Sequence, residues 1–228
     1  MGRDRCVQTL RLSPSPGHGG LGSERKIGRG AGSLPPPRVL PSLSPKEEAS
    51  MNFRSSVDVS KEKRAGLIEL LNELLANSLD LHSQAKQAHW NVKGRHFISA
   101  HELFEDVAKH TAAHSDDIAE RVAALGGYAL GTTRQVAQRT RLDEFAPSSL
   151  NGQDCLSELV DRLAAHATLL RAGIEQTGGD LADPVTEDLL VEVLREVEVD
   201  LWFLESHLDD PRRALPSTQE ENAGAPLS

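Results

Sequence analysis

Two imidazoles and three carboxylates that could bind a metal ion lie in one short stretch of the chain: His89, His101, Glu105, Asp116 and Glu120. Imidazole and carboxylate ligands together suit a non-haem iron or manganese site. These five residues are therefore the candidate metal-binding and catalytic residues. Their spacing along the chain limits how they can meet.

One predicted helix over residues 97–125 carries four of these side chains. Ser99 with Glu102 forms a capping-box pattern at its start, and Gly126 with Gly127 is a stop signal. At about 100° per residue, the four ligands fall within about 100° of one another. The apolar residues lie nearly opposite: Leu103, Phe104, Val107, Ile118, Val122 and Leu125. We expect the apolar stripe to face the chain's own core and the ligands to face away from it.

The distance along this helix excludes a single site for all four residues. His101 and Glu105 are one turn apart, as are Asp116 and Glu120, but the two pairs are about 22 Å apart along the axis. An antiparallel copy of the helix, related by a twofold axis, would set each pair against the other pair of its partner. Such a twofold creates two equivalent sites per dimer. The spacing therefore predicts a metal site shared between two copies of the chain.

The remaining patterns predict an all-α fold. We expect four long helices, over residues 60–91, 97–125, 151–177 and 184–208, and a short helix within TTRQVAQRTRLDEF. Asn151 with Asp154, and Asp183 before Pro184, are the helix starts. His89 lies near the end of the first helix, where a turn through Gly94 could bring it back toward His101. Two hairpins joined by a long crossover favour a ferritin-like four-helix bundle over a simple up-down bundle.

The same residues carry a family resemblance. The stretches HWNVKGRHFISAHELFE, DDIAERVAALGG and DLWFLESHL resemble the Dps mini-ferritins, over about residues 52–208. The resemblance implies a hollow dodecamer whose subunits oxidise Fe²⁺ at sites between twofold-related chains, preferentially with hydrogen peroxide, and store Fe³⁺ inside. It also implies protection of DNA against oxidative stress.

By this resemblance, His89, His101, Asp116 and Glu120 fall on the family's iron ligands. Glu105 falls where many members have Asp, so its carboxylate has an arm longer by one methylene. Trp90 resembles the family's tryptophan beside the iron centre.

Composition divides the chain into three parts. Residues 1–50 are rich in Gly, Pro, Ser and Arg and are predicted to be a disordered extension, or to precede a true start at Met51. Residues 51–208 should form the single bundle, and residues 209–228 a flexible tail. The first 50 residues carry eight Lys or Arg and four Asp or Glu, a balance of +4, so the −9 of the whole chain leaves −13 for residues 51–228.

Several classes of protein and site are not supported. No apolar run approaches the roughly 20 residues that cross a bilayer, and no secretory signal is visible, so we expect a soluble cytoplasmic protein, with nucleoid association as an alternative. We expect no disulfide framework from Cys6 and Cys155, and Cys155 should be a small buried or half-buried helix residue. The absence of Glu-x-x-His argues against the intrasubunit di-iron site of ferritins.

Other polar and aromatic residues have alternative interpretations. His82, His110 and His114 are expected to pack or form hydrogen bonds, with Asp117 as a partner for one of the last two. Trp202 is expected in the core. The third long helix is expected to expose its polar side chains: Glu158, Asp161, His166 and Glu175. The acidic residues around the start of the last helix either complement its dipole or line an iron pore: Asp180, Asp183, Glu187 and Asp188.

The function expected is that of an iron-storing ferroxidase. The alternative is a nucleoid protein whose main role is to coat DNA. Since residues 51–228 are strongly anionic and would repel phosphates, DNA binding should depend on the basic residues 1–50.

Overall fold

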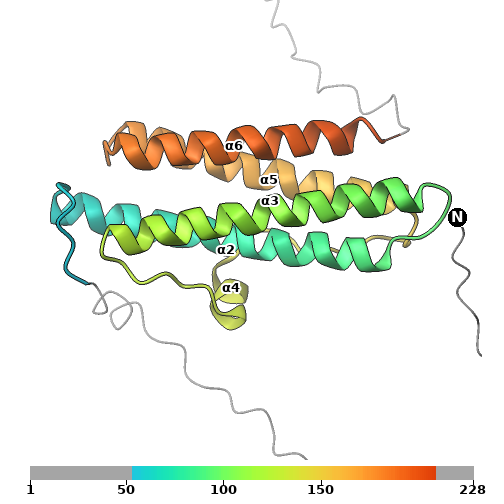
Figure 1. Ribbon diagram of the computed structural model, residues 1–228, viewed down its shortest axis with the longest axis horizontal. Coiled ribbons are helices and arrows are strands. Elements are labelled where there is room, and N and C mark those ends of the chain that lie inside the picture. Colours follow the sequence, from blue (N-terminus) through green and yellow to red (C-terminus); the bar gives the residue numbers. More distant parts are fainter. Residues whose placement is uncertain (1–52, 209–228) are drawn as a thin grey trace, which may run out of the picture. The chain divides into compact units, whose positions relative to one another are not determined.

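The computed structural model describes residues 53–208, and the predictions for residues 1–50 and 209–228 lie outside this range. The described residues form five helices: α2 (Lys61–Asn91), α3 (Phe97–Ala124), α4 (Thr133–Arg139), α5 (Gly152–Gly178) and α6 (Pro184–Glu205) (Figure 1). The only β pairing within residues 53–208 is an isolated bridge between Lys93 and Asn151. The predicted all-α class, the four long helices and the short crossover helix are confirmed.

Two helical hairpins build the bundle. A short turn joins α2 to α3, and the loop of residues 179–183 joins α5 to α6. α2 also packs on α5, and α3 on α6, while α4 lies against α2 on the outside of the bundle (Figure 1). The long crossover between α3 and α5 is the predicted ferritin-like connection.

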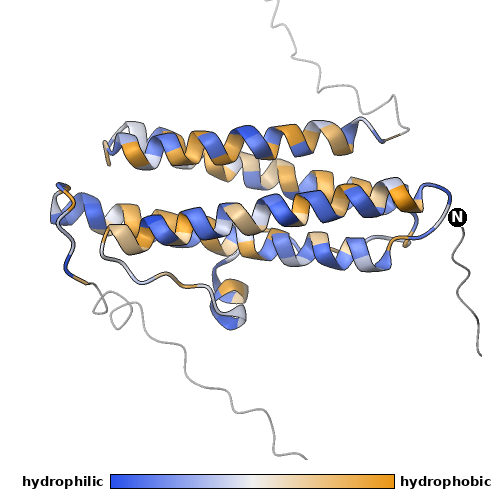
Figure 2. Ribbon diagram, in the orientation of Figure 1, coloured by the Kyte–Doolittle hydropathy of each residue, from blue (hydrophilic) through white to orange (hydrophobic). Residues whose placement is uncertain are grey.

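The apolar stripe of α3 faces the core, as its periodicity predicts. Phe104, Val107, Ile118 and Val122 are buried, and Leu103 is partly buried against them. Figure 2 shows the same division on the other long helices, with apolar and polar residues on different faces. Burying each such side chain contributes roughly 1.5–3 kcal/mol, so the stripe determines which side of α3 remains free for chemistry.

Buried polar side chains of α2 hold the crossover in place. The Asn72 amide donates to the Tyr128 carbonyl and its oxygen accepts the Leu130 N–H, at 3.2 and 2.9 Å. The Asn77 oxygen accepts the Arg141 N–H at 2.8 Å. These bonds satisfy groups that would otherwise be buried without partners, and they explain how a segment with only one short helix is positioned.

The helix starts differ in part from the predicted caps. α3 begins at Phe97 after His96, and Ser99 lies inside the helix, where its hydroxyl donates to the His96 carbonyl. The predicted capping box of Ser99 with Glu102 is therefore wrong. Asn151 does cap α5, since its side chain accepts the Asp154 N–H at 2.9 Å.

Asp183 is the N-cap residue of α6, as predicted, and its carboxylate also pairs with α3. It lies 2.6 Å from the Arg121 guanidinium and accepts a hydrogen bond from the Thr186 hydroxyl. Burial disfavours the charged carboxylate, but the bonds from Thr186 and Arg121 outweigh it and lower the pKa of Asp183. Asp183 is thus part of a buried ion pair between α3 and α6.

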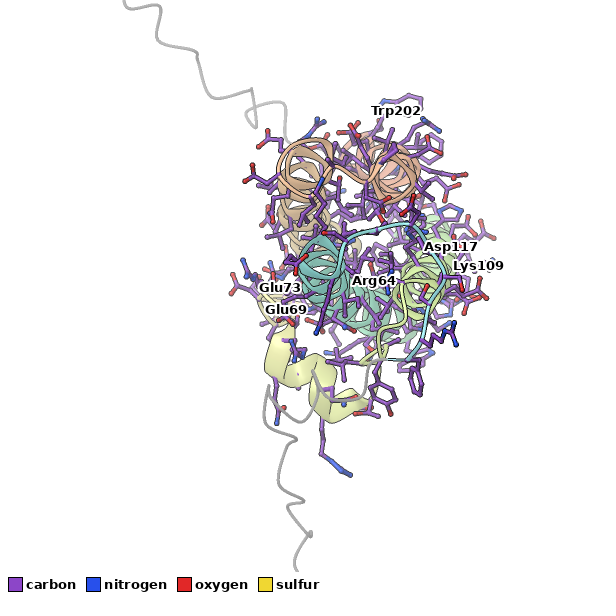
Figure 3. All side chains as sticks on the ribbon, turned by 90° about the vertical axis from the view of Figure 1, so that its left-hand side faces the viewer. Arg64, Glu69, Glu73, Lys109, Asp117 and Trp202 are labelled. Atoms are coloured by element: carbon purple, nitrogen blue, oxygen red, sulfur yellow. The ribbon has the colours of Figure 1, made fainter. Side chains whose placement is uncertain are left out.

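Two further expectations are wrong for the described chain. Trp202 is 62% exposed and points away from the bundle at its outer edge (Figure 3), so it is not a core residue. His166 is fully buried rather than on a solvated face of α5. The expectations for Cys155, which is buried, and for His82, whose Nδ1 lies 2.8 Å from the Ala108 carbonyl, are confirmed.

No helix within residues 53–208 combines the length and the apolar character that crossing a membrane would require.

Candidate metal centre

The turn between α2 and α3 brings the two candidate imidazoles together. Gly94 has φ +103°, a conformation that residues with a Cβ rarely adopt. The Phe97 N–H donates to the Gly94 carbonyl at 3.2 Å, and the Lys93 N–H donates to Leu150 at 2.7 Å, which ties the turn to the start of α5. The last turn of α2 consequently lies against the first turns of α3.

His89 and His101 form a reciprocal pair. Nδ1 of each ring lies 2.9 Å from the backbone carbonyl of the other residue. The rings stack with their centroids 3.7 Å apart and their planes 20° apart. The predicted approach of His89 to His101 is therefore confirmed.

These contacts determine which nitrogen of each ring can bind a metal. A carbonyl oxygen only accepts hydrogen bonds, so each Nδ1 must carry the proton and donate. In a neutral ring Nε2 then keeps its lone pair. A backbone carbonyl that orients the other ring nitrogen is the usual support of a metal-binding histidine. The pair thus presents two imidazole nitrogens suited to a transition-metal ion.

Glu105 completes this end of the site together with a lysine. Its Oε2 lies 3.5 Å from His89 Nε2 and 2.5 Å from Lys86 Nζ. The hydrogen bond from Lys86 is the main cause that lowers the pKa of Glu105, and the charges of Lys86, His89 and Lys109 act in the same direction. Glu105 is therefore a carboxylate at neutral pH, paired with a cation that a metal ion would have to displace.

Lys86 is the residue that the sequence analysis missed. It stands one helical turn before His89, so its side chain projects from the same side of α2. That spacing was the available signal. The ammonium group also lies 5.8 Å from the centre of the Trp90 ring, which is 70% exposed beside the site.

Asp116 and Glu120 lie apart from the other three candidates, as their spacing requires. Both are exposed. Figure 3 shows the neighbouring Asp117 on the outer side of α3, away from the core. In the described part of the chain, no three His, Cys, Asp or Glu side chains come together in an arrangement that could hold a metal ion.

The other histidines of α3 pair with α6. His110 Nδ1 lies 3.0 Å from both carboxylate oxygens of Asp200, and His114 Nε2 lies 2.8 Å from Glu196. The expected role in hydrogen bonding is confirmed for both, but Asp117 is not the partner of either.

Comparisons with known proteins agree with this architecture. Residues 68–214 match the family model described as a ferritin-like domain. The chain is 37% identical to the DNA protection during starvation protein of Agrobacterium fabrum, over 67% of this chain and 94% of that protein.

Solved structures give the same result. DpsA14 from Streptomyces coelicolor has a TM-score of 0.67 and 33% identity, covering 73% of this chain and 98% of that one. Dps from Microbacterium arborescens in the high iron form has a TM-score of 0.62 and 31% identity, covering 69% and 100%. The chain therefore belongs to the Dps family of ferritin-like proteins.

Proposed function

We propose that this protein oxidises Fe²⁺, with hydrogen peroxide as the oxidant, at sites that two subunits complete together. One observation carries the proposal. Nε2 of His89 lies 3.5 Å from the Glu105 carboxylate and the His101 ring stacks on His89 at one end of α3, while Asp116 and Glu120 are exposed farther along the same helix. Each half of the ligand set lacks the other within one chain.

A twofold axis across α3 would join the two halves. The two pairs are about 22 Å apart along the helix. If two antiparallel α3 helices met halfway between these pairs, each His101–Glu105 pair would lie against the partner's acidic pair. The axis would create the second site at the same time. The outer side of α3 is open to such a partner, because its apolar stripe already faces the core of its own chain.

The donor set suits iron as a substrate. Imidazole nitrogens bind Fe²⁺, and hard carboxylate oxygens favour the Fe³⁺ product. Each Fe²⁺ gives up one electron, and hydrogen peroxide takes up two as its O–O bond breaks and protons complete two water molecules. Binding two ions at one site would deliver both electrons together, and no hydroxyl radical would be released. Glu105 is the residue placed to reach the first ion or to bridge to the second.

Lys86 would control access to Glu105. In the free chain its ammonium group occupies the side of the carboxylate that a metal ion would use, at 2.5 Å. Iron binding must therefore release Lys86, and like-charge repulsion favours that release once the ion is present.

The double variant His101→Ala, Asp116→Ala tests the proposal. It removes one ligand from each half, so we expect peroxide-dependent Fe²⁺ oxidation to fall to the rate without protein. Asp117→Ala is the matched control, since it removes an exposed carboxylate next to Asp116 and should keep the wild-type rate. Wild-type oxidation by the double variant would refute the assignment.

We also propose that the subunits assemble into a hollow oligomer, a dodecamer, that stores the Fe³⁺ product. The membership of the Dps family and the incomplete ligand set of one chain support this. After iron loading, sedimentation should give a protein particle that carries its iron through chelation and washing. A monomer with full oxidation activity would contradict both the shared site and the storage.

DNA would be protected by this chemistry, which removes Fe²⁺ and peroxide together. The name of the Agrobacterium relative, DNA protection during starvation protein, supports the role. Direct coating of DNA would depend on residues 1–50, because residues 51–228 carry −13 (the −9 of the chain less +4). We expect a chain that starts at Met51 to give no gel shift at physiological salt, and a strong shift by that form would contradict this view.

A further inference from the structure

A layer of polar side chains crosses the middle of the bundle, outside the candidate metal centre. Each long helix contributes one member: Ser78 from α2, His114 from α3, His166 from α5 and Glu196 from α6. Among residues 53–208, no three His, Cys, Asp or Glu side chains lie close enough together to hold a metal ion. The layer therefore needs an explanation other than a bound ion.

His166 is the most enclosed member of this layer. Its side chain is fully buried, and so are Leu163 and Leu170, which lie one turn to either side on α5. Nε2 lies 3.3 Å from the Ser78 hydroxyl, and Nδ1 has no hydrogen-bond partner. In a neutral ring Nδ1 can be the nitrogen that keeps its lone pair, whereas in a charged ring it would carry a second N–H with no acceptor.

The groups that face the layer do not offer a negative charge to His166. From α2 the neighbour is the Ser78 hydroxyl. From α3 the neighbour is His114, whose charge would oppose a charge on His166. On α6, Glu196 is bonded to His114 and Asp200 to His110.

We propose that His166 is an acid sensor built into the bundle, whose protonation loosens the packing of the four long helices when the surroundings become acidic. The neutral ring fits its site, with one hydrogen bond and an apolar enclosure. The imidazolium does not fit, because a buried charge without a counter-ion is strongly disfavoured. Protonation therefore favours conformations in which the ring reaches water.

The direction of the effect follows from proton linkage. Burial, and secondly His114, lowers the pKa of His166 from 6.5 to about 3. The folded chain then binds a proton less readily than the unfolded chain. The contribution of His166 to stability is present above pH 6.5 and is lost as the pH falls toward 3. Over that window the group should raise the unfolding equilibrium constant by up to about tenfold per pH unit.

The test uses the full chain and the substitution His166→Gln. The amide of Gln can keep the bond to Ser78 but does not titrate in this range. In urea titrations of the wild type, His166 should make the unfolding equilibrium constant rise by up to about tenfold for each pH unit from pH 7 down to pH 4. We expect this part of the acid dependence to be missing in the variant. His207→Gln changes an exposed histidine that lies just after α6, so this variant is the control and should keep the wild-type dependence. Equal pH dependence of His166→Gln and the wild type would overturn the proposal.

A second measurement applies even where the variant fails to fold. The ring carbons of ¹³C-labelled histidines in the wild-type chain report the protonation of each imidazole. We expect the His166 ring to remain neutral at every pH at which the bundle is folded. A native His166 ring that titrates near pH 6.5 would also overturn the proposal.

Discussion

Two inactive variants of this chain should restore each other's activity when they form mixed dimers. The first variant, His101→Ala with Glu105→Ala, keeps the acidic pair but retains only His89 of the other half. The second, Asp116→Ala with Glu120→Ala, keeps only the histidine side. In a mixed dimer, one site receives the intact half of each chain, and the other site receives both damaged halves.

The arrangement sets the size of the recovery. Random association of equal amounts gives about half mixed dimers, and each of these has one complete site out of two. About a quarter of the wild-type sites should therefore return, and the oxidation rate should rise to about a quarter of the wild-type rate. A site built within a single chain would give no recovery, because neither variant contains one.

The assay unfolds the two variants together, refolds the mixture and follows the initial rate of Fe²⁺ oxidation by peroxide. Variants that are refolded separately and then combined are the control, and they should remain as inactive as each variant alone. If the co-refolded mixture is no faster than this control while sedimentation shows mixed particles, the reasoning from the helix spacing is refuted.

Three substitutions test other parts of the structure. Lys86→Met removes the main cause of the lowered pKa of Glu105, so this pKa should rise toward its usual value, and calorimetry should show tighter Fe²⁺ binding; weaker binding would contradict the proposed competition. Arg121→Met leaves the buried Asp183 carboxylate without its cation and should reduce the free energy of unfolding by about 3 kcal/mol in urea titrations at pH 7. Because the folded pKa of Asp183 is lowered, its stabilising effect is present above its ordinary 3.8 and is lost as the pH falls further, so the difference between Arg121→Met and the wild type should shrink in acid; a constant difference would argue against the ion pair. Asn72→Ala leaves the buried Leu130 N–H without an acceptor and should cost about 2 kcal/mol, whereas a change below about 0.5 kcal/mol would mean that the crossover is held by other contacts.

Helical periodicity predicted the elements of this fold well because it reports a local property. Apolar residues recur every three or four positions along α3, which places them on one face of the helix, and this face is the one that packs in the bundle. The predicted bounds of the long helices agree with the structure to within three residues, but one capping pattern was wrong. Ser99 with Glu102 had the right local pattern for a cap, but the turn at Gly94 starts α3 at Phe97, two residues earlier.

Neighbouring helices decided the environments that the sequence analysis misjudged. His166 belongs to no motif, and only the packing of α2 and α3 against α5 encloses it beside Ser78 and His114. Trp202 is large and apolar, but its position on α6 leaves it at the edge of the single chain. Asp183 is the N-cap residue that its sequence signature predicted, but its pairing with the Arg121 side chain from α3 was not foreseen.

The sequence by itself determined the number of long helices, the side of α3 on which the candidate ligands stand and their separation into two pairs, because each of these follows from residue spacing on a regular helix. Only the tertiary structure decided that His89 and His101 orient each other through their backbone carbonyls. It also decided that Lys86 forms an ion pair with Glu105 and that His166 lies in the core. These contacts join residues on different helices. Their distances depend on how the helices pack and turn, which no single segment encodes.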